Sequence, residues 1–209
     1  MKSIAIGLHL RADEIDPLAK AVPAADLFIS AIDVADGQPL GNRDLLIRVA
    51  TVRAQLLERA TFVAVRYGFT FRSTAEAESK ISAHAQRWRE ILEENRTRVE
   101  LTLKVAAANE RPDRRSFKSG ADYMRALHAA PSISDRFKSE VEAHIGALCA
   151  AHRWTSRDAT SVEFAGLIER EQLPRLAEAG ESLKRSCPDV PFLLSAPWPL
   201  EVFADVDHE

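Results

Sequence analysis

The sequence predicts an α+β fold built from two small sheet-plus-helix domains. Apolar runs that are typical of strands alternate with amphipathic helices, once on each side of a polar, basic stretch at residues 109–118. In addition, 46% of the 209 residues are hydrophobic, which suffices for a core in each half. We therefore expect an N-terminal domain at residues 1–108, a linker at 109–118 and a C-terminal domain at 119–209. A charged surface loop is the alternative interpretation of the basic stretch.

The N-terminal half begins with two predicted strands. Residues 3–8 (SIAIGL) place apolar side chains near alternate positions, and residues 26–32 (DLFISAI) form an almost continuous apolar run. Between them we expect one helical turn, around residues 14–20. The segment 37–41 (GQPLG) then has the composition of a turn.

Two helices and two further strands complete this half. The first helix is expected to follow Asn42, a favourable N-cap, and its apolar stripe consists of Leu45, Val49, Val52 and Leu56. A strand and turn are expected at residues 62–71. Ser73 and Glu76 then form a capping box for one long helix. The apolar stripe of that helix consists of Ile81, Ala85, Trp88 and Leu92. Strict alternation of apolar and polar residues at 99–105 predicts a half-buried strand.

The C-terminal half has a similar pattern. A helix is expected from Ser119 or Gly120 to Ala130, and a second helix from Ser134, with Phe137, Val141, Ile145 and Leu148 on one face. A strand at residues 162–168 and a helix at 173–187 follow. Residues 190–203 are extended but contain three prolines, which excludes a central strand along the whole segment. Both halves therefore fit two-layer sandwiches, which we assign to the ferredoxin-like type.

Composition limits the classes of function. The formal net charge is −3, and acidic and basic residues are interspersed, so no basic face for nucleic acid or for an anionic membrane is indicated. No apolar run approaches the roughly 20 residues needed to cross a bilayer. The two cysteines, Cys149 and Cys187, have no metal-binding or redox spacing and are expected to be free thiols in helices. We expect a soluble, cytoplasmic protein.

Catalytic and metal-binding patterns are not found in the sequence. The six histidines are dispersed. The nearest arrangement, His144 and His152, would place two imidazoles about 80° apart on one helix without a third ligand. The sequence contains no nucleophile elbow, no P-loop and no dinucleotide-binding glycine motif. We therefore expect no cofactor, no metal and no enzymatic activity, although an enzyme that uses unremarkable side chains is an alternative.

Three segments carry motifs in a definite order. The first is the strand at 62–71, which ends in Arg66-Tyr67-Gly68 and is followed by a charged helix and by residues 98–105 (RVELTLKV). The second is the helix start at 119–124 (SGADYM), and the third is Pro197-Trp198-Pro199 with Phe203. The motif residues are Arg66, Tyr67, Gly68, Phe71, Val99, Glu100, Lys104, Gly120, Tyr123, Pro197, Trp198, Pro199 and Phe203.

This series resembles the GvpF/GvpL family of gas vesicle proteins, whose members carry patterns such as VLPxRFGTxF, xVExxVKV, SGxxYL and GPWPPYSF in this order. The resemblance covers residues 62–203. This sequence departs from those patterns in that Ala64 replaces a proline, Tyr67 replaces a phenylalanine and Ala196 replaces a glycine. In addition, residues 200–203 are Leu-Glu-Val-Phe where the family usually has Pro-Tyr-Ser-Phe.

The resemblance implies an accessory or minor structural component of gas vesicle formation. It implies contact with the small shell protein GvpA and with other accessory proteins, with the N-terminal domain implicated in the shell contact. The expected location is the cytoplasm, at the gas vesicle. The rival interpretation is a regulatory module that binds a small molecule at the junction of two ferredoxin-like domains.

The motif residues also permit physical interpretations. Arg66 is expected either to form a structural ion pair with Glu100 or to contact a partner protein. Gly68 is expected to supply a turn with positive φ. Trp198, held between two prolines, is expected to fill a gap between the domains, with an exposed anchor for a partner as the alternative. Tyr123 is expected to lie in the core.

Overall fold

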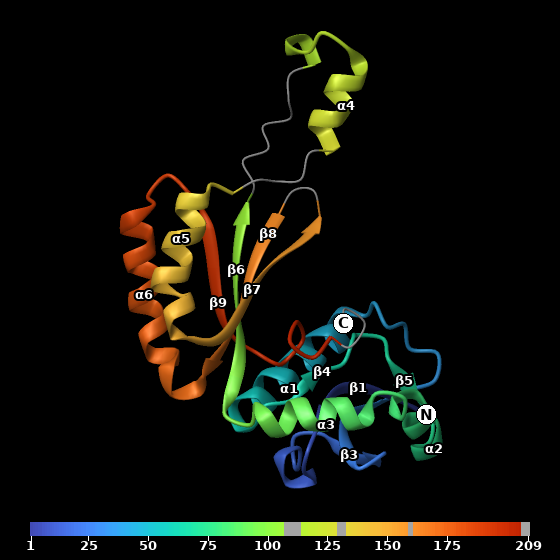
Figure 1. The fold of residues 1–209 in the computed structure, drawn as a ribbon. Helices are drawn as coiled ribbons and strands as arrows, with labels where there is room; N and C mark the ends of the chain where they lie inside the picture. Colours follow the sequence, from blue (N-terminus) through green and yellow to red (C-terminus); the bar gives the residue numbers. More distant parts are fainter. Residues whose placement is uncertain (107–113, 129–132, 159–160, 206–209) are drawn as a thin grey trace. The chain divides into compact units, whose positions relative to one another are not determined.

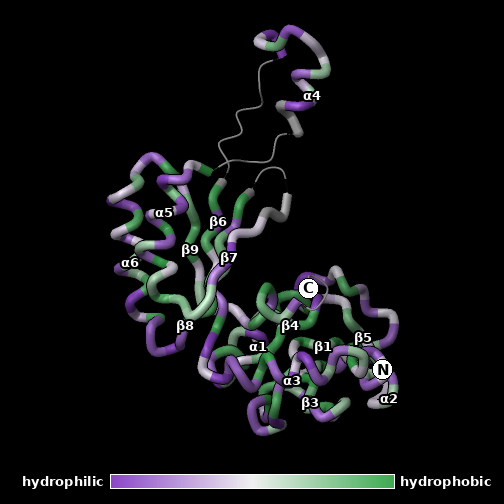
Figure 2. Tube along the Cα trace, viewed as in Figure 1, coloured by the Kyte–Doolittle hydropathy of each residue, from purple (hydrophilic) through white to green (hydrophobic). Residues whose placement is uncertain are grey.

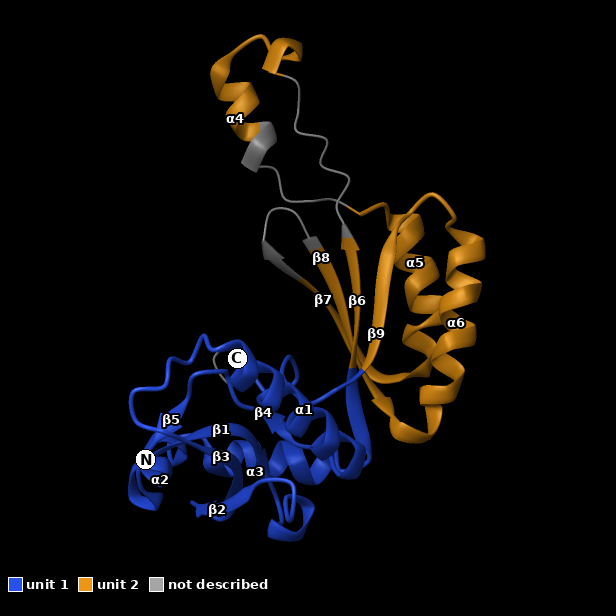
Figure 3. Ribbon diagram, turned by 180° about the vertical axis from the view of Figure 1, so that it is seen from behind, with its two compact units in different colours: residues 1–100, 197–209 blue, residues 101–196 orange. Residues whose placement is uncertain are grey.

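The computed structural model describes residues 1–106, 114–128, 133–158 and 161–205. The chain divides into two compact units, which Figures 1 and 3 show. Unit 1 comprises residues 1–100 and 197–209, and unit 2 comprises residues 101–196. Each unit contains a sheet and helices, which confirms the α+β class.

The sheet of unit 1 is formed around β1. Its strand order is β2-β3-β1-β4, and β5 also pairs with β1. The strands are β1 (Lys2–His9), β2 (Lys20–Ala24), β3 (Leu27–Val34), β4 (Val63–Ala64) and β5 (Thr70–Phe71). All their pairings are antiparallel, and every residue of β1 after Lys2 is buried. No helix separates the first three strands apart from a short 3₁₀ turn, η1 (Ala12–Glu14), so this element order differs from the ferredoxin-like order expected for residues 1–108.

Strand β2 occupies a place where the sequence predicted no strand. Residues 14–20 were expected to form a helical turn. The 3₁₀ turn η1 ends at Glu14, a hydrogen-bonded turn follows in which the amides of Leu18 and Ala19 donate to the carbonyl of Ile15, and β2 starts at Lys20. Pro23 lies within β2 and cannot donate a hydrogen bond to a neighbour. The proline is tolerated because β2 is at the edge of the sheet.

The helices of unit 1 are α1 (Arg43–Arg59), α2 (Thr74–Ile81) and α3 (Ala85–Glu94). The side chain of Asn42 accepts a hydrogen bond of 3.1 Å from the amide of Leu45, and the four predicted stripe residues of α1 are buried. Likewise, the amide of Glu76 donates to the hydroxyl of Ser73 at 3.2 Å, which confirms the predicted cap. The expected single long helix is divided in two after Ile81. There the backbone tightens, because the amide of His84 donates to the carbonyl of Ile81, three residues earlier, at 3.1 Å.

Unit 2 has a four-stranded sheet in the order β7-β8-β6-β9. Its elements are β6 (Arg98–Ala106), η2 (Arg114–Ser116), α4 (Gly120–His128), α5 (Asp135–His144), η3 (Gly146–Leu148), β7 (Cys149–Asp158), β8 (Ser161–Glu169), η4 (Arg170–Gln172), α6 (Leu173–Ser186) and β9 (Phe192–Trp198). With α4 set aside, the chain order is βαββαβ. Helices α5 and α6 lie side by side against the sheet (Figure 1). Strands β6, β8 and β9 carry many hydrophobic residues, whereas β7 is largely polar and α5 and α6 alternate between polar and apolar residues (Figure 2).

Strand β7 was also not expected from the sequence. The stripe that ends at Leu148 predicted a helix, but α5 ends at His144 and is followed by the short turn η3. Cys149 therefore begins a strand, not a helix, while Cys187 caps the end of α6. Both cysteines are free thiols, and burial raises the pKa of Cys149 to about 11.

The boundaries of the two units differ from the predicted domains. Unit 1 ends within β6, at Glu100, and resumes at Pro197, so the C-terminal residues belong with the N-terminal ones. The sequence could not indicate this return because it depends on contacts between distant segments. Residues 109–113 of the predicted linker, and Pro131, lie outside the described residues. Residues 114–118 include the turn η2 and fall within unit 2. Among the described residues, no helix is long and apolar enough to span a membrane.

Candidate functional site

The segment 197–205 crosses unit 1 beside strand β4. The amide of Leu200 donates to the carbonyl of Phe62 at 2.9 Å, and the amide of Ala64 donates to the carbonyl of Leu200 at 2.8 Å. These bonds form a parallel bridge between Leu200 and Val63. Leu200 is fully buried, so the segment both extends the sheet at β4 and adds to its core.

A single buried carboxylate fixes the next three residues. Oε1 of Glu100 accepts hydrogen bonds from the amides of Glu201 at 2.8 Å and Phe203 at 2.7 Å, and Oε2 accepts one from the amide of Val202 at 3.1 Å. Glu100 is 2% exposed. Hydrogen bonds to a charged acceptor are stronger than those between neutral groups. Glu100 therefore anchors the C-terminal segment to the start of β6.

This arrangement overturns the expected ion pair between Arg66 and Glu100. The carboxylate of Glu100 is occupied by backbone amides, and β6 lies in a different sheet from β4. Within the described part of the chain, the side chain of Arg66 forms no ion pair, and it is exposed. The alternative, contact between Arg66 and a partner, is untested.

Burial of Glu100 predicts a dependence of stability on pH. Burial raises the pKa of Glu100, although its three amide donors oppose this effect. A carboxyl group with a raised pKa stabilises the fold most below its ordinary pKa, and this contribution declines as the pH rises through the raised pKa. We expect the free energy of unfolding of the unaltered protein, relative to that of Glu100→Gln, to fall as the pH rises from the ordinary pKa of 4.5 through the raised pKa of Glu100. Chemical unfolding of both proteins across this range measures the difference, and a constant difference would contradict the prediction.

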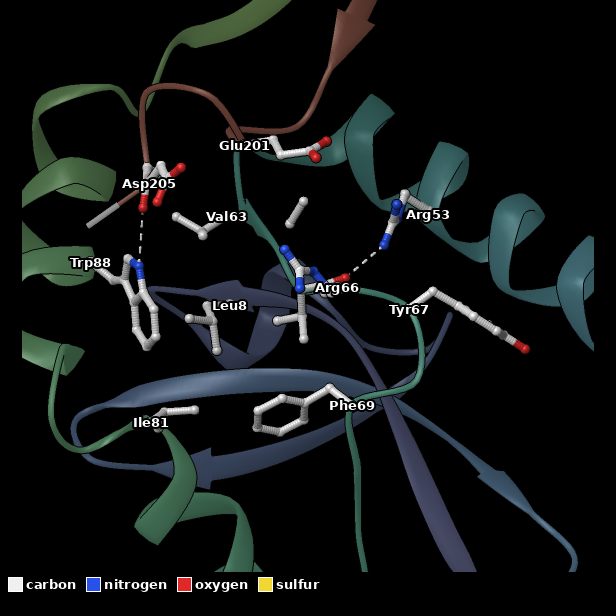
Figure 4. Close-up of a pocket in the computed structure, with 13 residues that line it drawn as sticks. Leu8, Arg53, Val63, Arg66, Tyr67, Phe69, Ile81, Trp88, Glu201 and Asp205 are labelled. Carbon is white, nitrogen blue, oxygen red and sulfur yellow. Dashed lines mark hydrogen bonds between the residues drawn. The ribbon is translucent and has the colours of Figure 1, made fainter. Parts of the chain in front are cut away.

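The C-terminal segment closes one side of a cavity of about 400 Å³ in unit 1 (Figure 4). Arg53 projects into it from α1, Trp88 from α3, and Glu201 and Asp205 from the C-terminal segment. The indole Nε1 of Trp88 donates to the carbonyl of Ala204 at 3.3 Å. The remaining lining residues are Leu8, Val63, Ala64, Val65, Arg66, Tyr67, Phe69, Ile81 and Ala204.

Two arginines in this cavity lack a carboxylate partner among the described residues. Nη2 of Arg53 donates to the carbonyl of Val65 at 3.0 Å, but its Nε is buried without a hydrogen-bond acceptor. Burial lowers the pKa of Arg53, and the charge of Glu201 opposes this shift. Arg66 enters the same cavity from the segment after β4 (Figure 4).

An apolar hollow of about 470 Å³ lies next to α1, and Arg53 and Tyr67 line both it and the cavity. The other lining residues of this apolar hollow are Leu46, Val49, Ala50, Ala54, Leu57, Pro197, Trp198 and Pro199. Trp198 is 47% exposed, Leu46 is 42% exposed, and Ile47 on the same helix is 53% exposed. Within unit 1 the indole of Trp198 forms one wall of an open hollow, and the expectation that it fills a gap between the domains stays a prediction.

The other motif residues have mainly structural positions. The hydroxyl of Tyr67 donates to the carbonyl of Leu40, and Gly68 has a φ of +98°, as expected for a turn. Phe71 and Val99 are buried. In unit 2, Lys104 pairs with the buried Glu163 at 2.9 Å.

The second motif also lies in unit 2. Gly120 begins α4, as predicted. Tyr123 is only half-buried and packs edge-on against Phe117, with 5.9 Å between the ring centroids. This motif therefore does not contribute to the cavity or the apolar hollow in unit 1.

The sequence indicated the motif residues of the site but not the residues that α1 contributes. Arg66, Tyr67 and Pro197-Trp198-Pro199 were singled out, and the structure places them around the two adjoining concavities. Arg53 and Leu46 were missed. The available signal was that Leu46 and Ile47 lie outside the buried stripe of α1, where polar residues are usual.

Comparisons with known proteins give one family. The family model described as gas vesicle synthesis protein GvpL/GvpF matches residues 16–204. No curated protein matches the chain.

Two crystal structures have a similar fold. The gas vesicle protein GvpF from Microcystis aeruginosa superposes with a TM-score of 0.72 at 12% sequence identity, covering 98% of this chain and 99% of that chain. GvpF from Anabaena sp. PCC7120 superposes with a TM-score of 0.71 at 13% identity, covering 99% of this chain and 97% of that chain.

Proposed function

Since this chain belongs to the gas vesicle GvpL/GvpF family, we propose that it acts in gas vesicle formation by binding the shell protein GvpA and other accessory proteins. In this proposal it works by binding and not by catalysis, in the cytoplasm and at the growing vesicle. Its role is to hold shell subunits before they join the wall.

The observation that supports this proposal best is the apolar hollow beside Trp198. Large exposed apolar side chains gather there on one helix and one adjoining segment. Aromatic anchors at the rim of an apolar groove are typical of sites that bind other proteins. A shell protein with exposed apolar surface or unpaired strand edges is prone to aggregation before assembly, and a groove of this kind would cover part of that surface.

The primary test is binding of purified shell protein to the intact chain. We expect Trp198→Ala to weaken this binding about 30-fold, because truncation of a central aromatic anchor costs about 2 kcal/mol. Leu46→Ala should weaken it by a smaller factor. Leu193→Ala is the matched control, since Leu193 is 63% exposed but lies on β9 in unit 2. Calorimetry or biolayer interferometry measures the dissociation constants.

Two outcomes would contradict the proposal. One is that the chain binds neither the shell protein nor any accessory protein encoded by the neighbouring genes. The other is equal loss of binding in Leu193→Ala and Trp198→Ala. Strong thermal stabilisation by a small metabolite would instead favour the regulatory-module interpretation.

A further inference from the structure

We propose that Arg53 and Arg66 together bind a carboxylate of the partner protein, so that the site selects an apolar segment carrying an aspartate or glutamate. This inference rests on the proposed function and specifies the chemistry of the segment that is bound. Its basis is a pair of cations that form no ion pair with the described residues, next to an open apolar hollow.

Arg53 is the stronger part of the argument. Its side chain lies between the cavity and the apolar hollow and makes one hydrogen bond, to the carbonyl of Val65. The Nε proton is buried and finds no acceptor among the residues that the structure describes. A guanidinium has five donors, and the half-buried charge of Arg53 is partly withdrawn from water with only the distant charge of Glu201 to offset this cost. An incoming carboxylate would both neutralise this charge and accept from the unused donors.

Arg66 adds a second cation to the same cavity, from the segment after β4 (Figure 4). Its side chain makes no hydrogen bond or ion pair with the described residues. Two like charges in one cavity repel each other. An anion between them is favoured because it attracts each arginine and offsets this repulsion. The planar fork of a guanidinium matches a carboxylate better than it matches a single backbone carbonyl.

The carboxylates of the chain itself do not meet this need. Glu201 and Asp205 line the cavity, but neither forms an ion pair within 4.0 Å of Arg53 or Arg66 in the described part of the chain. The charge of Glu201 reaches Arg53 only as a longer-range attraction. Both acids are exposed.

Continuity between the two concavities identifies one occupant. Arg53 and Tyr67 line both the cavity and the apolar hollow, so a bound carboxylate at Arg53 would be adjacent to the apolar surface of α1 and Trp198. A small free carboxylate would leave the apolar hollow exposed to water. A protein segment with apolar side chains beside an acidic one would fill the apolar hollow by hydrophobic contact and the cavity by charge complementarity.

The experiment compares three arginine-to-glutamine variants for binding to the purified shell protein. We expect Arg53→Gln to weaken binding about 30-fold and Arg66→Gln about 10-fold, because each leaves a partner carboxylate without its cation. Arg48→Gln is the matched control, because Arg48 is exposed on α1 but lines neither concavity, and it should change binding less than about twofold. Arg66→Gln removes no hydrogen bond with the described residues, so its folding should be unaffected, as thermal unfolding will verify.

A double-mutant cycle identifies the partner group. Each acidic residue of the shell protein is changed to its amide and combined with Arg66→Gln, and one position should show that the two losses are not additive. If Arg53→Gln and Arg66→Gln both bind the shell protein as tightly as the unaltered chain does, this inference is wrong and the proposed function stands. Equal loss in Arg48→Gln would mean non-specific electrostatic attraction and would also overturn it. If the unaltered chain does not bind, both proposals fail.

Discussion

Replacing Glu100 with alanine is expected to lower the free energy of unfolding by about 3 kcal/mol and to release residues 201–203 from unit 1. The carboxylate is the acceptor for three backbone amides, at 2.8, 3.1 and 2.7 Å. A hydrogen bond to a charged group contributes about 1.5–3 kcal/mol, and some of the total is recovered because exposed amides can bind water instead. The loss also weakens the Leu200 bridge to β4.

Unfolding followed by tryptophan fluorescence measures this effect, because Trp88 donates to Ala204 in the same segment. Hydrogen exchange provides the local readout, since the amides of residues 201–203 should lose protection. Glu100→Gln should cost only about 1 kcal/mol, because one amide oxygen can replace Oε1, which accepts two of the three bonds. Glu94→Ala, on the exposed end of α3, is the control and should change stability by less than about 0.5 kcal/mol. Retained protection in Glu100→Ala would show that the anchor lies elsewhere.

Gly7→Ala is expected to lower the free energy of unfolding by about 3 kcal/mol. A methyl group at Gly7 would lie 2.3 Å from Cδ2 and 2.8 Å from Cε2 of Phe62. The Phe62 ring cannot move aside easily, because it is fully buried and stacked on His9 with 4.9 Å between the ring centroids. Phe62 also accepts the hydrogen bond from Leu200, so a shift of this residue would disturb the candidate site.

Chemical unfolding tests this prediction, with Gly41→Ala as the control. Gly41 has no atom within 4 Å of the position of an added methyl group, so its substitution should be nearly neutral. Phe62→Ala alone should cost about 4 kcal/mol, and the double variant should cost less than the sum of the two single variants, because removal of the ring relieves the clash. Additive losses would show that the close approach of Gly7 and Phe62 does not determine the effect.

Local signals predicted the parts of this fold that local interactions stabilise. The cap at Asn42 and the stripe of α1 were predicted correctly because capping and amphipathicity are properties of neighbouring residues. The single helix predicted after Ser73 was wrong because the backbone tightens where the amide of His84 donates to the carbonyl of Ile81, while the apolar stripe of the sequence continues across this break. Strand β2 was not predicted because it contains a proline. Strand β7 was not predicted because the apolar spacing that ends at Leu148 is typical of a helix.

The site itself could be predicted only in part. Pro197-Trp198-Pro199 and Arg66-Tyr67-Gly68 have distinctive composition, so the sequence drew attention to them. The role of Glu100 could not be predicted, because its partners are backbone amides 101, 102 and 103 residues later, and an amide is present at almost every position. Arg53 was missed because one arginine in a charged helix is unremarkable until its surroundings in space are known.

Because residues 197–205 complete unit 1, its folding is tied to the order of protein synthesis. A ribosome must translate the whole of unit 2, residues 101–196, before Leu200 can reach β4. At ordinary elongation rates the nascent chain spends roughly 5–20 s in this interval. During that time Glu100 lacks its amide donors, and the edge of β4 is open to other strands. Premature termination before Leu200 would therefore leave unit 1 unfinished while all the residues of unit 2 had been made.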